Sequence, residues 1–160
     1  KNEEIATLSN FVSKAKFDTK VKKIEDDIIA FVNEYLVNVY STLNPKLKVE
    51  IAECNQHFIM RFIPIEIIIV LENLLRNSYD AGADTAYISW EFDQKPIMVY
   101  RDNGNGIKSS ILDRIFDYRF STTGGGGLGM CHIKDIVQNM NGNIIVNNQL
   151  DKGVEFKISF

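Results

Sequence analysis

Two asparagines lie one helical turn apart in a segment that is otherwise strongly apolar. Asn73 and Asn77 are four residues apart, so a helix would present both amides on one face, and Glu66 and Asp80 would extend the same polar stripe. A solvated face is the usual role of a polar stripe, but so apolar a helix is expected to be nearly all buried. Amide carbonyl oxygens suit a hard cation such as Mg²⁺ when nucleotide phosphates supply the remaining ligands. The stripe therefore favours a ligand-binding face.

A carboxylate and two glycines form a second group. Asp102 follows an expected strand over residues 97–101 and opens the sequence Asp-Asn-Gly-Asn-Gly-Ile, in which Gly104 and Gly106 permit a close backbone approach. The carboxylate can accept a hydrogen bond from an exocyclic amine, such as that of adenine. Taken alone, Asp-Asn-Gly is more often a hairpin turn, so its meaning depends on the neighbouring motifs.

A glycine-rich run forms the third group. Ser121-Thr122-Thr123 is followed by Gly124-Gly125-Gly126-Gly127-Leu128-Gly129, which leads into an expected helix over residues 128–140. Free backbone N–H groups ahead of a helix N-terminus bind phosphate. No Gly-Lys-Ser/Thr follows, so this is not the Walker pattern. A flexible loop is the plain alternative, although mobility also suits a lid that closes over a nucleotide.

The apolar periodicity predicts the elements that position these groups. Steps of three and four residues predict helices, and alternation predicts strands that form a sheet with one covered face, so the class is α+β. The expected helices span residues 21–43, 65–81 and 128–140. The expected strands span residues 47–51, 58–62, 86–92, 97–101, 143–147 and 154–160.

Composition limits the classes of function. The chain has 160 residues, 45% of them hydrophobic, which fits one domain with a single core. The net charge of −3 gives no reason to expect nucleic acid as a partner. No apolar run approaches the roughly 20 residues that cross a bilayer, so no membrane contact is expected. Two cysteines without metal-ligand spacing, and no signal segment, favour a cytoplasmic location.

Residues 1–16 differ from the rest of the chain. Ile5, Leu8, Phe11 and Val12 recur there at helical spacing, ahead of the main pattern. We expect this segment to be the end of a preceding helical region or a linker. The domain itself is then expected to span residues 17–160.

Four motifs in this order resemble those of the catalytic ATP-binding domain of histidine kinases, in the GHKL superfamily. Residues 72–81 resemble the N box, 102–107 the first glycine box, 115–123 the F box and 125–130 the second glycine box, and Gly153-Val154-Glu155-Phe156 resembles the closing box. The resemblance covers about residues 17–160. It implies the Bergerat fold, a two-layer sandwich in which helices cover one face of a mixed sheet, with a glycine-rich ATP lid.

The resemblance also implies ATP and Mg²⁺ as cofactors and assigns roles to residues. Asn77 would coordinate Mg²⁺ with Asn73 helping at the phosphates, so these two are the implied catalytic residues, and Asp102 would hold the adenine amine. Phe116 and Phe120 would anchor the lid, or are plain core residues. The implied nucleotide-binding residues are Asn73, Asn77, Asp80, Asp102, Gly104, Gly106, Ile107, Phe120, Thr122, Thr123, Gly125, Gly126, Gly127, Leu128 and Gly129.

Three hypotheses of function remain open at this point. Asn73 stands where the hydrolysing relatives carry a glutamate general base, and an amide cannot accept the proton of an attacking water, although Glu72 is only one residue away. The leading hypothesis is therefore a phosphotransferase domain of a histidine kinase. An ATPase-type conformational switch and a nucleotide-binding pseudokinase are the alternatives.

Neither histidine of the chain fits the phosphoacceptor pattern. An acidic residue usually follows the acceptor, whereas Phe58 follows His57 and Ile133 follows His132. The implied partner is therefore a histidine-bearing dimerisation domain, in cis or in trans, with a response regulator as a further candidate partner. Two other departures from the family pattern are Asp80, where many histidine kinases carry lysine, and Val154, which replaces a hydroxyl residue.

Overall fold

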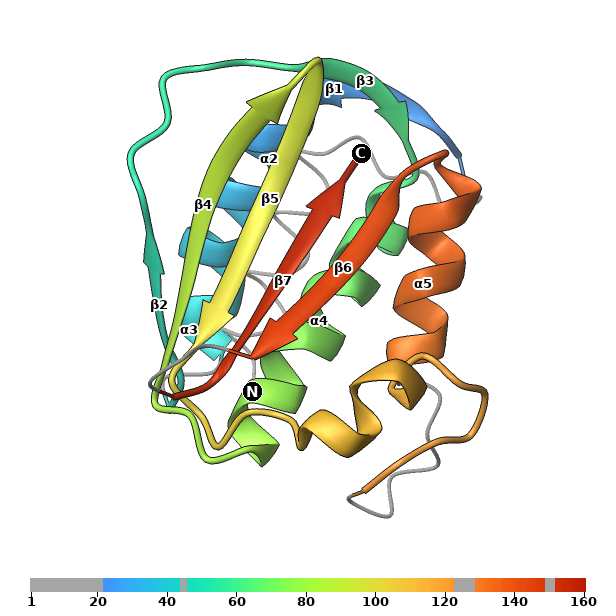
Figure 1. Ribbon diagram of the computed structural model, residues 1–160. Coiled ribbons are helices and arrows are strands. Elements are labelled where there is room, and N and C mark those ends of the chain that lie inside the picture. Colours follow the sequence, from blue (N-terminus) through green and yellow to red (C-terminus); the bar gives the residue numbers. More distant parts are fainter. Residues whose placement is uncertain (1–21, 44–45, 123–128, 149–151) are drawn as a thin grey trace.

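The computed structural model describes residues 22–43, 46–122, 129–148 and 152–160 (Figure 1). In this part of the chain a five-stranded sheet has the order β2-β4-β5-β7-β6, with β2 parallel to β4 and the other pairs antiparallel. Its strands are β2 (Lys48–Ile51), β4 (Thr85–Asp93), β5 (Lys95–Asp102), β6 (Asn143–Asn148) and β7 (Val154–Ser159). The predicted mixed sheet is confirmed.

Helices cover one face of this sheet, with α2 and α4 behind the strands and α5 beside α4 (Figure 1). The helical elements are α2 (Ile28–Tyr35), the π-helical turn η1 (Leu36–Tyr40), α3 (Ser41–Leu43), α4 (Pro64–Asp80), the 3₁₀ segment η2 (Ser109–Arg114) and α5 (Gly129–Asn139). The other face carries ion pairs between strands, such as Arg101 of β5 with Glu155 of β7 at 2.5 Å and Lys157 of β7 with Glu91 of β4 at 2.8 Å. This arrangement confirms the α+β two-layer class.

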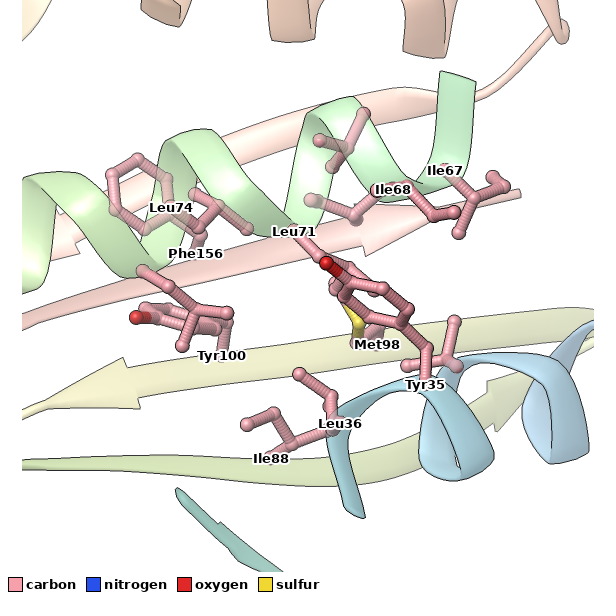
Figure 2. Close-up of a cluster of buried hydrophobic side chains, with 14 of the residues drawn as sticks. Tyr35, Leu36, Ile67, Ile68, Leu71, Leu74, Ile88, Met98, Tyr100 and Phe156 are labelled. Atoms are coloured by element: carbon pink, nitrogen blue, oxygen red, sulfur yellow. The ribbon is translucent and has the colours of Figure 1, made fainter. Parts of the chain in front are cut away.

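The core lies between the helices and the sheet, with α4 at its centre. Figure 2 shows Leu71 and Leu74 of α4 close to Met98, Tyr100 and Phe156 of the strands, and all five are at most 2% exposed. Each such side chain contributes about 1.5–3 kcal/mol through the removal of apolar surface from water. This packing fixes the rotation of α4, so the asparagine stripe on its other side has a defined direction.

The predicted helix over residues 21–43 is wrong at its beginning. Strand β1 (Ile24–Asp27) precedes α2 and pairs antiparallel with β3 (Ile59–Phe62) in a separate two-stranded sheet, so residues 58–62 do not join the main sheet. Asp27 sets the boundary, because its carboxylate caps α2 through the N–H groups of Ile29 and Ala30. The four-residue step from Ile24 to Ile28 fits the strand period of two as well as the helical period, which explains the error.

Several predictions fall outside the described residues. These are the expected preceding region, residues 1–16, and the lid positions Thr123, Gly125, Gly126, Gly127 and Leu128. No helix in the described ranges has both the length and the apolar character that a membrane span requires.

Candidate functional site

Helix α4 presents the two asparagines. It begins with Pro64, whose fixed backbone suits the first helical position, and continues without interruption to Asp80. The amide nitrogen of Asn73 donates to the carbonyl oxygen of Ile69 at 2.8 Å, and that of Asn77 donates to the Met130 sulfur at 2.9 Å. Both nitrogens have a protein partner. The carbonyl oxygen of each amide is the atom that can coordinate a cation.

The first turn of α5 faces the same asparagines. A Cβ atom placed on Gly129 would lie 2.8 Å from Oδ1 of Asn73, so a side chain at this position would collide with the asparagine. Gly129 is the first residue of α5, where the backbone N–H groups have no partner within the helix. Amide oxygens and a helix N-terminus therefore converge, an arrangement suited to a cation together with an anionic group.

Asp102 ends β5 and is 5% exposed. Its Oδ1 atom accepts hydrogen bonds from the N–H groups of Gly104 at 3.0 Å and Val154 at 3.3 Å. Its Oδ2 atom accepts from the hydroxyl of Ser78 at 2.6 Å. Donors from α4, from β7 and from the loop after β5 thus fix the orientation of this carboxylate.

Gly153 makes the contact between β7 and Asp102 possible. Its φ angle is +91°, and a Cβ atom there would lie 1.9 Å from the carbonyl oxygen of Asp102. Only glycine accommodates both conditions. The glycine of the closing motif therefore brings the two strands together at the buried carboxylate.

The predicted loop after Asp102 starts against the end of α4. Oδ1 of Asn103 accepts from the N–H groups of Asp84 and Thr85 at 3.0 and 3.1 Å, which holds the loop to the start of β4. A Cβ atom on Gly104 would lie 3.0 Å from the carbonyl oxygen of Ala81. Gly104 therefore permits close approach of the loop to the end of α4.

The end of this loop is held by β6. Asn148 accepts from the N–H of Ile107 at 2.8 Å and donates its amide nitrogen back to the carbonyl oxygen of the same residue. Gly106 has a φ of +72° and lies against the backbone of Gly153. Gly104, Gly106 and Ile107 thus form one fixed turn beside Asp102.

The remaining predicted residues lie at the edge of this region. Phe116 and Phe120 are half-buried against the core, with the Lys134 ammonium 5.7 Å and the Arg114 guanidinium 4.7 Å from the respective ring centres. This agrees with packing roles for both rings. Asp80 and Thr122 are exposed.

The site thus consists of two groups joined through α4. Asn73, Asn77 and Gly129 form one group between α4 and α5, and Asp102 with its glycine turn forms the other. Ser78 connects them, because it follows Asn77 in the chain and donates to Asp102. Among the residues that the structure describes, no cluster of three or more His, Cys, Asp or Glu side chains is arranged to hold a metal.

Comparison with known proteins assigns this arrangement to a family. A sequence profile of the family described as "Histidine kinase-, DNA gyrase B-, and HSP90-like ATPase" matches residues 63–160, from the start of α4 to the end of the chain. The chain belongs to this ATPase family. The match includes every group of the site described above, and the predicted recognition is confirmed.

Sensor kinases are among the proteins whose sequences are similar to this chain. The probable C4-dicarboxylate sensor kinase of Halalkalibacterium halodurans is 35% identical over 103 residues, which are 58% of this chain and 19% of that kinase. Sporulation kinase A of Bacillus subtilis is 33% identical over 95 residues, or 57% of this chain and 16% of that kinase. The chain therefore spans less than a fifth of the length of these two relatives.

Solved structures agree on the fold of this ATPase-family domain. The catalytic domain of histidine kinase ThkA has a TM-score of 0.71 at 21% identity, covering 87% of this chain and 95% of that one. The ATP binding domain of PrrB from Mycobacterium tuberculosis has a TM-score of 0.70 at 19% identity, covering 85% and 94%. The chain thus shares the fold of these two domains.

Sequence reasoning missed three side chains that hold the site of this ATPase-family domain. Ser78 and Tyr100 lie beneath Asp102, and Asn148 holds the glycine turn. One signal was present for Ser78, which is the polar residue four positions after buried Leu74 on the apolar face of α4. The contacts of Tyr100 and Asn148 join residues at least 22 positions apart, and no local pattern predicts them.

Proposed function

We propose that this domain binds ATP with Mg²⁺ between α4 and the first turn of α5 and donates the γ-phosphoryl group to a histidine on another domain or protein. The arrangement of Asn73 and Asn77 opposite the N-terminus of α5, joined through Ser78 to the buried Asp102, is the observation that carries the proposal. Asp102 would accept the adenine amine, and the α5 end of the site would hold the phosphates.

The residues fit a magnesium ion. Oδ1 of Asn77 would be the protein ligand, with Asn73 beside it, since the amide nitrogens of both are held by other acceptors. Two neutral amides leave room for phosphate oxygens and water, the usual partners of Mg²⁺ in nucleotide sites. When bound, the ion supplies positive charge that offsets the charge developing on the phosphates.

The chain's own residues would position the nucleotide while an external imidazole attacks. A bond forms between the imidazole nitrogen and the γ-phosphorus, and the bond from that phosphorus to the bridging oxygen breaks, so that ADP leaves. The imidazole proton passes to solvent. Free N–H groups at the start of α5 would stabilise the phosphate oxygens in this step.

The position of Glu72 favours transfer over hydrolysis. Its carboxylate accepts a hydrogen bond from the Tyr35 hydroxyl of α2, on a different side of α4 from Asn73 and Asn77. Burial and the nearby Glu72 raise the pKa of Tyr35, so this hydroxyl keeps its proton. A carboxylate engaged in this way lacks the access to a γ-phosphate that a general base requires.

The proposed partners follow because this domain would bind ATP while another domain or protein would supply the acceptor histidine. The acceptor histidine would belong to a dimerisation domain, in cis or in trans, and a response regulator would then receive the phosphoryl group. A cytoplasmic location suits both steps, because ATP and Mg²⁺ are supplied there.

The test uses the full-length protein that contains this chain and ATP labelled at the γ-phosphate. We expect an acid-labile, base-stable label on the protein, lost in Asn77→Ala and retained in Asn139→Ala, an exposed asparagine of α5. Phosphate released without protein labelling would indicate an ATPase-type switch instead. Binding with neither outcome would indicate a pseudokinase.

A second arm tests hydrolysis in the 160-residue chain alone. Phosphate release should be slow and unchanged by Glu72→Gln, since Glu72 contacts Tyr35 rather than the site. Rapid release that Glu72→Gln abolishes would overturn the transfer proposal in favour of an ATPase with Glu72 as its base.

A further inference from the structure

Three buried polar side chains form a continuous hydrogen-bonded row beneath the base end of the site. The Tyr100 hydroxyl lies 2.6 Å from the Ser78 hydroxyl, which lies 2.6 Å from Oδ2 of Asp102. Tyr100, Ser78 and Asp102 are 0%, 1% and 5% exposed. Figure 2 shows Tyr100 on β5 among the apolar side chains packed under α4. Polar groups so deeply buried are costly unless each is paired, and this row pairs all three.

The direction of the hydrogen bonds in this row follows from the chemistry of its members. An ionised carboxylate only accepts, so the single proton of the Ser78 hydroxyl is donated to Asp102. The Tyr100 hydroxyl must then donate to Ser78. Burial raises the pKa of Tyr100, and nearby Asp102 and Tyr40 add to the rise, so Tyr100 keeps the proton that it donates. The row is therefore a fixed relay from Tyr100 through Ser78 to Asp102.

The relay leaves one oxygen of Asp102 with room for a ligand. Oδ1 already accepts from Gly104 and Val154, whereas Ser78 is the donor that the described residues supply to Oδ2. A carboxylate oxygen has two acceptor positions, so Oδ2 retains one. The bond from Ser78 fixes the direction in which that position points.

We propose that Ser78 and Tyr100 are positioning residues that hold Oδ2 of Asp102 for the exocyclic amine of the base, and so set the preference for adenine over purines without that amine. This proposal rests on the proposed function, since it needs ATP in the site. Neither residue has to touch the nucleotide. Their effect is to reduce the freedom of the acceptor before the base arrives, which makes recognition stricter.

The experiment compares ATP with purine riboside triphosphate, which lacks the 6-amino group, by calorimetry in the presence of Mg²⁺. The parent chain should prefer ATP. Ser78→Ala should reduce that preference by about three- to tenfold, and Tyr100→Phe by about two- to threefold, because each removes one hydrogen bond of the relay. Affinity for the analogue should stay near that of the parent. Ser159→Ala, which removes a hydroxyl from the far end of β7, should leave both affinities unchanged.

Different contrary outcomes would overturn the positioning role of Ser78 and Tyr100 or the proposed function on which it rests. An equal loss for both nucleotides in Ser78→Ala and Tyr100→Phe would mean a general structural role and would overturn the relay. A parent that binds both nucleotides equally would overturn base selection while nucleotide binding stands. A parent that binds neither would overturn the proposed function. If Ser78→Ala does not fold, Tyr100→Phe decides the question, since its ring keeps the packing of the core.

Discussion

The base end and the phosphate end of the site are built differently. At the base end, Asp102 is buried and receives three hydrogen bonds from protein donors. At the phosphate end, Asn77 is exposed and its amide nitrogen has a methionine sulfur as its acceptor, a weak partner. The orientation of Asp102 at the first end is thus fixed by protein donors alone. At the second end Asn77 makes one weak contact, and the proposed Mg²⁺-ATP would add ligands there.

This contrast predicts a division of roles. Substitutions at the base end should change folding and base recognition together, because the same bonds serve both. Substitutions at the phosphate end should change metal-dependent binding while leaving the fold intact, because few of the contacts there are structural.

The largest effect is expected for Gly153→Ala. The added Cβ would lie 1.9 Å from the Asp102 carbonyl oxygen at a φ of +91°, so the strand ends must separate. We expect a loss of about 3 kcal/mol or more in the free energy of unfolding, measured with urea. Gly82→Ala is the matched control, because its φ is +75° but the nearest atom is 3.8 Å away. It should cost only about 1 kcal/mol. Equal losses would show that the contact with Asp102 is unimportant.

Asp102→Asn should have the next largest effect, on ATP affinity. The new amide has one N–H₂ group in place of a carboxylate oxygen. In one orientation this group faces the adenine amine, which needs an acceptor. In the other it faces the N–H groups of Gly104 and Val154, which also need an acceptor. We expect a loss of roughly 1–3 kcal/mol in binding free energy by calorimetry. Unchanged affinity would remove Asp102 from the base pocket. Asp113→Asn, an exposed carboxylate on η2, serves as the control.

Asn77→Ala tests the phosphate end. The free energy of unfolding of the variant should lie within about 0.5 kcal/mol of that of the parent, since an exposed side chain with one weak contact contributes little to stability. Most of the strengthening of ATP binding by Mg²⁺ should disappear, while binding in EDTA stays close to that of the parent. Asn139→Ala should retain the full Mg²⁺ effect. If Asn77→Ala also retains it, the metal ligand lies elsewhere.

The two ends of the site also differ in how far they could be predicted from the sequence. The asparagine stripe could be predicted because the helical period alone places Asn73 and Asn77 on one face, and Asp102 could be placed because a strand pattern ends there. The donors beneath Asp102 could not, since Ser78 has the size of an ordinary core residue and its partners lie on a strand more than 20 positions away. Tertiary pairing, rather than any local pattern, creates the base end.

The error at β1 has a similar origin. Ile24 fits a helix and a strand equally well by spacing, and only pairing with Phe62 decides between them. The capping role of Asp27 was locally available as a signal, because aspartate favours the position before a helix. The apolar pattern that continues through it from 21 to 43 outweighed that signal.

Substitution of Asp27 is expected to have the smallest effect on ATP affinity, and it serves as a control for Asp102→Asn. It is also a buried carboxylate with backbone donors, but it lies at the start of α2 and pairs with His57 at 2.5 Å. Asp27→Asn keeps an acceptor for the helix cap and removes the charge, so stability at pH 7 should fall by roughly 0.5–1 kcal/mol. ATP affinity should not change. A fall in affinity like that of Asp102→Asn would mean that any buried carboxylate matters, and the contrast between the two ends would lose its support.

The loss of stability in Asp27→Asn should depend on pH in one direction. Burial alone would raise the pKa of Asp27, but the hydrogen bonds from His57 and from the backbone of Phe58, Ala30 and Ile29 outweigh it, so the pKa lies below its ordinary value of 3.8. A lowered folded-state pKa stabilises the fold above the unfolded value, and this contribution is lost as the pH falls through the folded one. The difference in the free energy of unfolding between parent and Asp27→Asn, measured with urea at pH 5 and pH 3, should therefore be smaller at pH 3. A gap of equal size at pH 3 would assign the effect to packing rather than to charge.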